Sequence, residues 1–380
     1  MKRIWILLLC ALLLCGCAQN NAENIPSTDP VVTEETIPVT EPEKPHIVDV
    51  ILSEMTLEEK VGQLFLVRYA DEYALEDITA CHLGGFVLFG KDFKNRTPEE
   101  AALLIKNLQS EAKIPLLIAV DEEGGIVTRV STYSQYRSEN FPSPRNLYDA
   151  GGIELVGQTE TEKCQLLKGL GINVNLAPVC DITTDPNAFM YRRSLGQDPQ
   201  TTGQYIASVL AIMRENQMGG VLKHFPGYGN NTDTHIAIAV DERPLEELES
   251  RDLIPFQYGI RSSCDAIMVS HTFVNCLDSE YPASLSAKVH QYIRQDMAFD
   301  GVITTDDLVM QAITDLYGHE EAAVMAVEAG NDLLCCTEYR VQYDAVFDAV
   351  RSGRLSESQI DQSVRRILFW KYSLGLIPEP

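Results

Sequence analysis

Residues 85–121, GFVLFGKDFKNRTPEEAALLIKNLQSEAKIPLLIAVD, decide the fold class of this protein. Two short apolar runs, Gly85–Phe89 and Leu116–Asp121, flank a stretch with the pattern of an amphipathic helix. Thr97-Pro-Glu-Glu100 predicts the start of that helix, because it combines a capping box with a proline at the first helical position. A strand, a helix and a second strand in this order indicate a unit of a parallel sheet.

The same alternation recurs along the chain from about His46. Eight apolar runs predict strands, and they are Leu64–Arg68, Gly85–Phe89, Leu116–Asp121, Val174–Pro178, Gly220–Phe225, Ala266–His271, Gly301–Asp306 and Asp332–Cys336. Thr56 and Ser356 begin two further helix-start patterns. Eight strands with intervening helices favour an α/β protein with a single (β/α)8 TIM-type barrel over residues 47–380. A doubly wound open sheet is the alternative, but no G-x-G-x-x-G follows the first run.

The first 17 residues have the features of a lipoprotein signal peptide. Two basic residues precede the apolar stretch Ile4–Leu14, which is shorter than a membrane-spanning helix. The stretch ends in LCGC, which resembles a bacterial lipobox with Cys17 as the lipidated residue; an ordinary secretory signal is the alternative. Residues 18–46 are rich in Pro, Glu and Thr, so we expect a flexible tether. An extracytoplasmic lipoprotein, anchored to the membrane through acyl chains on Cys17, is expected.

The composition argues against several classes of function. The formal net charge of −25 leaves no basic surface to neutralise phosphates, so nucleic acid is not an expected partner. Seven cysteines follow Cys17, an odd number without a C-x-x-C pair, so we expect mostly free, buried thiols and no structural zinc site. Neither a metal nor a cofactor is expected. The sequence does not set the oligomeric state, and a monomer is the default expectation.

Polar residues follow five of the eight predicted strands. In a barrel of this type, the active site lies at the carboxyl ends of the strands. The segments at these ends are Asp121-Glu-Glu-Gly-Gly125, Ala177-Pro-Val-Cys-Asp181, Lys223-His-Phe-Pro-Gly227, Ser270-His271 and Thr305-Asp-Asp307. Together they predict a cup lined with carboxylates, cations and imidazoles, which suits a neutral polyhydroxyl ligand such as a sugar.

Four segments resemble motifs of one enzyme family. They are 121–125 (DEEGG), 193–199 (RSLGQDP), 223–235 (KHFPGYGNNTDTH) and 301–310 (GVITTDDLVM), in the family's order. These segments resemble the bacterial β-N-acetylglucosaminidases of glycoside hydrolase family 3, and the resemblance runs from about Met55 to Leu376. It implies a retaining exo-β-N-acetylglucosaminidase that acts on peptidoglycan fragments or chitin-type oligosaccharides through a covalent glycosyl-enzyme.

The resemblance also implies the catalytic groups. Asp306 would be the nucleophile, and Asp233 with His235 would be the acid/base pair. Asp306 suits this role because it ends a strand, and Lys223 and Arg193 would keep it ionised. A carboxylate two residues from an imidazole can fix the tautomer of the ring and leave its other nitrogen free for proton transfer.

Further residues are expected to bind the sugar. By the same resemblance, its hydroxyls would be bound by Asp121, Arg193, Lys223 and His224. We place His271 with them as a substrate contact, with a supporting role in the site as the equal alternative. Asp181 is expected to be structural and to form hydrogen bonds within its own loop.

Three departures from the family pattern affect the loops around the site. Ile126 replaces an arginine, Tyr228 replaces a histidine, and Asn230 replaces an aspartate. We expect them to change loop packing and the second sugar subsite. Two alternatives stay open: a β-N-acetylglucosaminide phosphorylase, whose neutral histidine base would not repel phosphate, and a surface sugar-binding lipoprotein that has lost catalysis.

Overall fold

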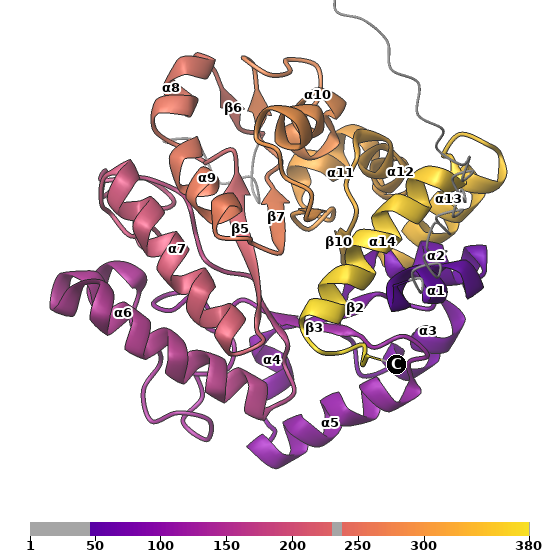
Figure 1. The fold of residues 1–380 in the computed structure, drawn as a ribbon, viewed down its shortest axis with the longest axis horizontal. Coiled ribbons are helices and arrows are strands. Elements are labelled where there is room, and N and C mark those ends of the chain that lie inside the picture. The colour runs from indigo at the N-terminus through magenta and orange to yellow at the C-terminus, as the bar shows by residue number, and fades with distance from the viewer. Residues whose placement is uncertain (1–45, 230–237, 380) are drawn as a thin grey trace, which may run out of the picture. The chain divides into compact units, whose positions relative to one another are not determined.

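The computed structural model describes residues 46–229 and 238–379. Eight parallel strands form a barrel in the order β10-β1-β2-β3-β4-β5-β7-β9, with helices arranged around them (Figure 1). The strands are β1 (Phe65–Arg68), β2 (Gly85–Leu88), β3 (Leu117–Val120), β4 (Val174–Asn175), β5 (Gly219–Phe225), β7 (Ala266–Val269), β9 (Val302–Thr305) and β10 (Leu334–Cys336). Each coincides with one of the eight apolar runs, so the predicted (β/α)8 barrel is confirmed.

The barrel closes between β9 and β10. Thr304 in β9 forms a parallel bridge with Leu333, the residue before β10. The Thr305 amide donates to the Leu333 carbonyl at 3.2 Å, and the Thr305 hydroxyl accepts from the Cys335 amide at 3.0 Å. These contacts join the two ends of the sheet, as closure of a barrel requires.

Helices connect the strands and cover the outside of the barrel (Figure 1). The helices of seven or more residues are α1 (Ile47–Glu54), α2 (Leu57–Gln63), α3 (Ala74–Ala80), α5 (Pro98–Glu111), α6 (Pro144–Gly169), α7 (Pro199–Glu215), α9 (Leu253–Arg261), α11 (Gln311–Tyr317), α12 (His319–Ala329), α13 (Tyr339–Arg351) and α14 (Glu357–Ser373). Shorter helices are α4 (Gly90–Phe93), α8 (Leu245–Ser250) and α10 (Ala287–Gln291). Among the described residues, none of the helices is both long enough and apolar enough to span a bilayer.

The predicted helix starts are present. At the start of α5, the Thr97 hydroxyl accepts from the Glu100 amide at 3.2 Å, and the Glu100 carboxylate accepts from the Thr97 amide at 2.8 Å. The same reciprocal capping box opens α2 at Thr56, and the Ser356 side chain caps α14. Each cap satisfies amides that a helix leaves without an internal acceptor in its first turn.

The interior of the barrel is apolar. Inward-facing residues of the strands, such as Val87, Leu117, Val221 and Val302, form one buried cluster. Trp370 on α14 belongs to the same cluster, so this helix closes one end of the barrel. Because apolar side chains fill the interior, the polar side chains that follow the strands lie together at the carboxyl ends of the strands.

Two short strands do not belong to the barrel. The two-residue strands β6 (Val240–Asp241) and β8 (Phe273–Val274) pair with each other in parallel and follow β5 and β7 in the chain.

The seven cysteines after Cys17 are free thiols, as predicted, and four of them are buried. Cys17 and the predicted tether, except for its last residue, lie outside the described residues.

Candidate active site

A cavity of about 450 Å³ opens at the carboxyl ends of the barrel strands. Each of the eight strands has a lining residue within it or directly after it, and these residues are, in chain order, Arg68, Val87, Asp121, Leu176, Lys223, Met268, Asp306 and Cys335. Of the predicted site residues that the structure describes, five line this cavity, and they are Asp121, Arg193, Lys223, His224 and Asp306. The structure therefore brings together residues that are up to 185 positions apart in the chain, counting from 121 to 306.

Lys223 lies between two carboxylates at the wall of the cavity. Its Nζ is 2.8 Å from Asp121 Oδ1 and 2.6 Å from Glu123 Oε1, and its side chain is 2% exposed. Burial alone would lower the pKa of Lys223, but the two carboxylates outweigh burial and raise this pKa. For Asp121, the charges of Lys223 and Arg129 likewise overcome burial and lower the pKa. Both side chains are therefore held in their charged forms, one as a donor and one as an acceptor for a hydroxyl group.

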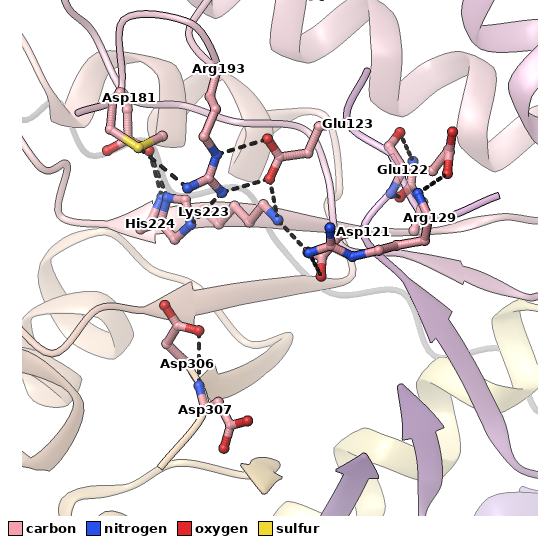
Figure 2. Close-up of polar contacts among 12 residues, drawn as sticks. Asp121, Glu122, Glu123, Arg129, Asp181, Arg193, Lys223, His224, Asp306 and Asp307 are labelled. Atoms are coloured by element: carbon pink, nitrogen blue, oxygen red, sulfur yellow. Dashed lines mark hydrogen bonds and ion pairs between the residues drawn. The ribbon is translucent and has the colours of Figure 1, made fainter. Parts of the chain in front are cut away.

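Arg193 continues this network to His224 (Figure 2). Its guanidinium donates two parallel hydrogen bonds to Glu123, at 3.0 and 2.7 Å. Its Nη2 lies 3.2 Å from His224 Nε2, and His224 Nδ1 lies 2.8 Å from Asp181 Oδ2. A guanidinium has no acceptor, so Nε2 must accept and the ring proton must be on Nδ1. These contacts form one continuous network of charged groups and hydrogen bonds. It runs from Arg129 through Asp121, Lys223, Glu123, Arg193 and His224 to Asp181.

Asp181 is structural, as expected, but its partners are not in its own loop. Its carboxylate accepts from the amide of His224 at 3.2 Å and from the amide of Tyr228 at 2.7 Å. The prediction of bonds within the loop after β4 is therefore wrong, because this loop lies against the one after β5. The Tyr228 ring packs edge-on against His224 and Phe189, with centroids 5.2 and 5.5 Å apart. Tyr228 thus supports two residues of the cavity wall.

Asp306 lies across the cavity from this network (Figure 2). Its amide donates to the Val269 carbonyl at 3.1 Å, which extends the β7–β9 pairing to the end of the strand. Its Oδ1 accepts from the Asp307 amide at 2.8 Å. Lys223 and Arg193 line the same cavity as Asp306, but their ion pairs are with Asp121 and Glu123.

Asp307, and not Asp306, shapes the turn that follows β9. The Asp307 carboxylate accepts from the Val309 amide at 3.1 Å and from the Thr337 hydroxyl at 2.6 Å. Burial raises the pKa of Asp307. Helix α11 begins only at Gln311, with Met310 as its cap residue. Asp306 is therefore not a helix cap, and its carboxylate lines the cavity.

His271 is placed behind the cavity instead of at its wall. The side chain is fully buried and is absent from the lining residues. Its Nε2 is 3.0 Å from the Asp307 carbonyl, and its Nδ1 is 2.7 Å from the Ser284 hydroxyl. A carbonyl only accepts, so Nε2 donates to it. These contacts are those expected of the supporting alternative, and a contact of His271 with the sugar stays a prediction.

The sequence did not indicate the roles of Glu122, Glu123 and Arg129. Glu122 is fully buried and accepts from three successive amides, beginning with that of Arg129 at 2.7 Å. The turn before them needs glycine, because Gly124 has φ +104° and a Cβ there would lie 2.3 Å from the Pro142 carbonyl oxygen. The loop returns Arg129 to the cavity, with its Nη2 3.3 Å from Asp121 Oδ2. A positive charge is thus present in this loop although Ile126 replaces the arginine of the family pattern.

Asp233, His235 and Asn230 lie outside the described residues. The residues on either side of their segment are held at the carboxyl ends of the strands. Before it, the Tyr228 amide binds Asp181, and after it, β6 pairs with β8. Arg243 lies beside both flanks: it pairs with Asp241 at 2.6 Å and donates to the Gly227 carbonyl at 3.5 Å. In the described part of the chain, no group of three or more His, Cys, Asp or Glu side chains is placed to hold a metal ion.

Comparison with known proteins identifies the family. The model of the glycosyl hydrolase family 3 N-terminal domain matches residues 56–369. The protein named β-hexosaminidase LpqI of Mycobacterium tuberculosis is 32% identical over 325 residues, which are 82% of this chain and 82% of that protein. A protein named β-hexosaminidase of Idiomarina loihiensis is 30% identical over 328 residues, which are 83% of this chain and 95% of that protein.

Solved structures agree with this result. A family 3 β-N-acetylglucosaminidase from a Paenibacillus species has a TM-score of 0.80 and 33% identity over 86% of this chain. The present chain covers 64% of that protein, which is less than two thirds of its length. The structure of M. tuberculosis LpqI has a TM-score of 0.79 and 29% identity, and it covers 88% of this chain and 97% of its own. The protein therefore belongs to glycoside hydrolase family 3.

Proposed function

We propose that the protein is a retaining exo-β-N-acetylglucosaminidase that hydrolyses terminal β-linked N-acetylhexosamine from peptidoglycan fragments or chitin-type oligosaccharides. One observation carries the proposal: Asp306 faces a network of fixed charges across a single cavity at the carboxyl ends of the strands. The names of the relatives, β-hexosaminidase and β-N-acetylglucosaminidase, support the same activity. They favour water over phosphate as the group that accepts the sugar.

In this proposal, the network binds the terminal sugar. Lys223 and Arg193 donate to hydroxyl oxygens and Asp121 accepts from a hydroxyl proton, because their charged forms are stabilised by one another. His224 presents its ring at the cavity wall, fixed by Asp181 on one nitrogen and by Arg193 on the other. A rigid set of partners orients the sugar without further ordering cost when it binds.

Asp306 and the Asp233–His235 pair would perform the chemistry. The Asp306 carboxylate forms a bond to the anomeric carbon as the glycosidic bond breaks, and His235 gives a proton to the departing oxygen. Water then attacks the same carbon as His235 removes a proton from the water, and the bond between that carbon and Asp306 breaks. Asp233 would orient the imidazole through one ring nitrogen.

The first test measures the substrate preference of the wild type and the effect of replacing the proposed nucleophile. The wild-type protein should hydrolyse an aryl β-N-acetylglucosaminide in preference to an aryl β-glucoside, with no increase in rate when phosphate is added. Asp306→Asn should remove nearly all turnover, because a neutral amide cannot attack the anomeric carbon. Asp300→Asn is the matched control, since that carboxylate is 91% exposed and lies outside the cavity. Turnover by Asp306→Asn near the wild-type rate would show that another group is the nucleophile.

The second test separates the acid from the nucleophile. An aryl group that leaves readily needs little protonation, whereas a sugar hydroxyl needs a great deal. His235→Ala should therefore release a burst of aryl alcohol in pre-steady-state kinetics and fail on a disaccharide. Asp233→Ala should show the same pattern more mildly, because the imidazole remains but is no longer oriented. Equal loss on both substrates without a burst would assign the acid/base role to another residue.

We also propose that the enzyme is a membrane-anchored lipoprotein. The support is the lipobox at Cys17 and the composition of residues 18–46. In this arrangement, acyl chains on Cys17 hold the protein at an extracytoplasmic membrane surface, and residues 18–46 link them to the barrel of residues 47–380.

A further inference from the structure

Residues 183–196 are the part of the connection between β4 and α7 that reaches the candidate active site. Phe189 and Arg193 line the cavity, and the Arg193 guanidinium faces Glu123 and His224 (Figure 2). Backbone hydrogen bonds inside this stretch join residues only three or four positions apart, as in the bond from the Ser194 amide to the Met190 carbonyl at 2.9 Å. Such local turns do not set where Arg193 lies relative to the barrel.

Arg145, in the first turn of α6, lies at the base of this stretch. Its Nη2 donates to the Thr183 carbonyl at 3.0 Å and to the Ser194 hydroxyl at 3.1 Å. These two acceptors are 11 positions apart, both belong to buried residues, and the segment between them carries Phe189 and Arg193. One guanidinium on α6 therefore joins the two ends of the stretch.

Two further contacts fix the orientation of the Arg145 guanidinium. Its Cζ lies 4.0 Å from the centre of the Tyr191 ring. A Cβ built on Gly196 would lie 2.1 Å from the same Cζ, so the backbone of Gly196 packs directly against the guanidinium. Gly196 also has φ +77°, a conformation that side chains disfavour. The stretch is thus in contact with Arg145 at its two ends and at Tyr191.

These contacts explain why the RSLGQDP segment contains more than the residue that lines the cavity. Ser194 and Gly196 follow Arg193 by one and three positions, and both are in contact with Arg145. Asp198 accepts from two amides at the start of α7 and caps that helix. The backbone that carries the Arg193 side chain is therefore held by α6 through Arg145 and continues directly into α7.

Arg145 itself is not part of the cavity wall. Its Nε is buried and has no hydrogen-bond partner among the residues that the structure describes. A buried donor without an acceptor costs free energy, and local costs of this kind are typical of parts of a protein that function constrains. The contacts of Arg145 suit a residue that would act on the sugar through Arg193 and not by touching the sugar.

We propose that Arg145 is a positioning residue, which holds residues 183–196 so that Arg193 is presented to the terminal sugar. The inference rests on the proposed function and adds a residue on which sugar binding depends. Without Arg145, residues 183 and 194 would no longer be joined, and the guanidinium of Arg193 would lose its fixed place beside Glu123 and His224. The expected result is weaker binding of the sugar, because Arg193 must then be ordered when the sugar binds.

The test is a double-mutant cycle between Arg145 and Arg193, measured on an aryl β-N-acetylglucosaminide. Arg145→Gln should lower kcat/KM by about tenfold, mainly through a higher KM, and Arg193→Gln should lower it at least as much. The double variant should be no more than about twofold worse than Arg193→Gln alone, because Arg145 acts through Arg193. Arg145→Lys keeps the charge but not the planar fork, so it should recover only part of the loss.

Two further variants complete the design. Gly196→Ala places a methyl group where the Arg145 guanidinium lies, so it should raise KM as Arg145→Gln does. Arg294→Gln is the matched control: that guanidinium donates to the carbonyls of Phe299 and Gly301 at 3.0 and 2.6 Å and lies 5.7 Å from the Phe299 ring, but it does not line the candidate active site. It should lower the melting temperature and leave KM at the wild-type value.

A purely structural role of Arg145 gives a different result. Partial unfolding would lower kcat, and the losses from Arg145→Gln and Arg193→Gln would then multiply in the double variant. That result overturns the inference, and so does a wild-type KM in Arg145→Gln or, if this variant does not fold, in Gly196→Ala. In these cases, hydrolysis of the aryl substrate by the wild type still supports the proposed function. A folded wild-type protein that does not hydrolyse it contradicts the proposed function, and the role of Arg145 in that function with it.

Discussion

Glu123 lies just beyond the end of β3, with a side chain that is 1% exposed, between the cations of Arg193 and Lys223. Burial alone would raise its pKa, but these two cations outweigh burial and hold the pKa of Glu123 far below its usual range. Removal of one member of a buried ion pair is costly in free energy, because the charged partners that remain are then buried without compensation. Glu123 therefore balances two cations that line the candidate active site, although it is not part of the lining itself.

This balance predicts a large effect on stability. Glu123→Gln should lower the free energy of unfolding by about 3 kcal/mol, because it leaves two buried cations with one carboxylate fewer. Urea denaturation at neutral pH measures the change. Glu162→Gln is the matched control: Glu162 also binds an arginine through two oxygens, but it is 54% exposed and should cost less than about 1 kcal/mol. Equal losses in the two variants would show that burial does not strengthen the Glu123 pairs.

At the scale of single elements, α14 and α2 meet around a buried lysine. Lys371 on α14 is fully buried, and its Nζ donates to the Gln63 side chain at 2.6 Å. Burial lowers the pKa of Lys371 from its ordinary 10.5 to about 7. Between these two values, the unfolded chain binds a proton at this residue that the folded protein does not bind. Stability contributed by this site must therefore rise with pH in that window.

The expected result is a difference in pH dependence between two variants. From pH 6 to pH 9, the free energy of unfolding of the wild type should increase by about 2 kcal/mol relative to that of Lys371→Met. Lys60→Met should show no such difference, because two carboxylates overcome the effect of burial on Lys60 and raise its pKa above the window. Denaturation curves at the two pH values provide the measurement. A constant difference between the wild type and Lys371→Met would mean that Lys371 stays protonated in the fold.

Most of the barrel strands could be predicted from the sequence, because each strand is a short apolar run and polar residues follow it. The convergence of Asp121, Lys223 and Asp306 followed from the same pattern, since the carboxyl ends of parallel strands meet. Strand β4 is shorter than its run, which extends to Pro178. Hydrogen bonds to the neighbouring strands nevertheless continue beyond Asn175, because the Leu176 amide donates to the Val120 carbonyl and the Ala177 carbonyl accepts from the Val221 amide, both at 2.8 Å.

Other features of the site could not be predicted, because they depend on contacts between segments that are distant in sequence. Asp181 binds one amide in β5 and another in the loop after it, and His271 binds a carbonyl after β9. No local pattern indicates such partners, because they depend on how two loops pass each other. Strands β6 and β8 have two residues each, too few to show an alternating pattern.

At the scale of the whole molecule, net charge and attachment are connected. The formal net charge is −25, and an acidic protein is not attracted electrostatically to an anionic lipid surface. Retention at such a membrane would therefore require the acyl chains proposed for Cys17, because two or more buried chains give stable attachment.

The anchor can be tested by fractionation of the cells that produce the protein. Wild-type activity should stay with the membrane fraction after a wash in high salt and should be released by detergent, because acyl chains are held by burial and not by charge. Cys17→Ala should move the activity into the soluble extracytoplasmic fraction or the medium, with kcat and KM for the aryl substrate unchanged, since Cys17 lies in the signal region and not in the barrel. Cys276→Ala, which removes a partly exposed thiol of the barrel, is the matched control and should remain with the membrane. If Cys17→Ala stays with the membrane, or if salt alone releases the wild type, attachment depends on another part of the protein.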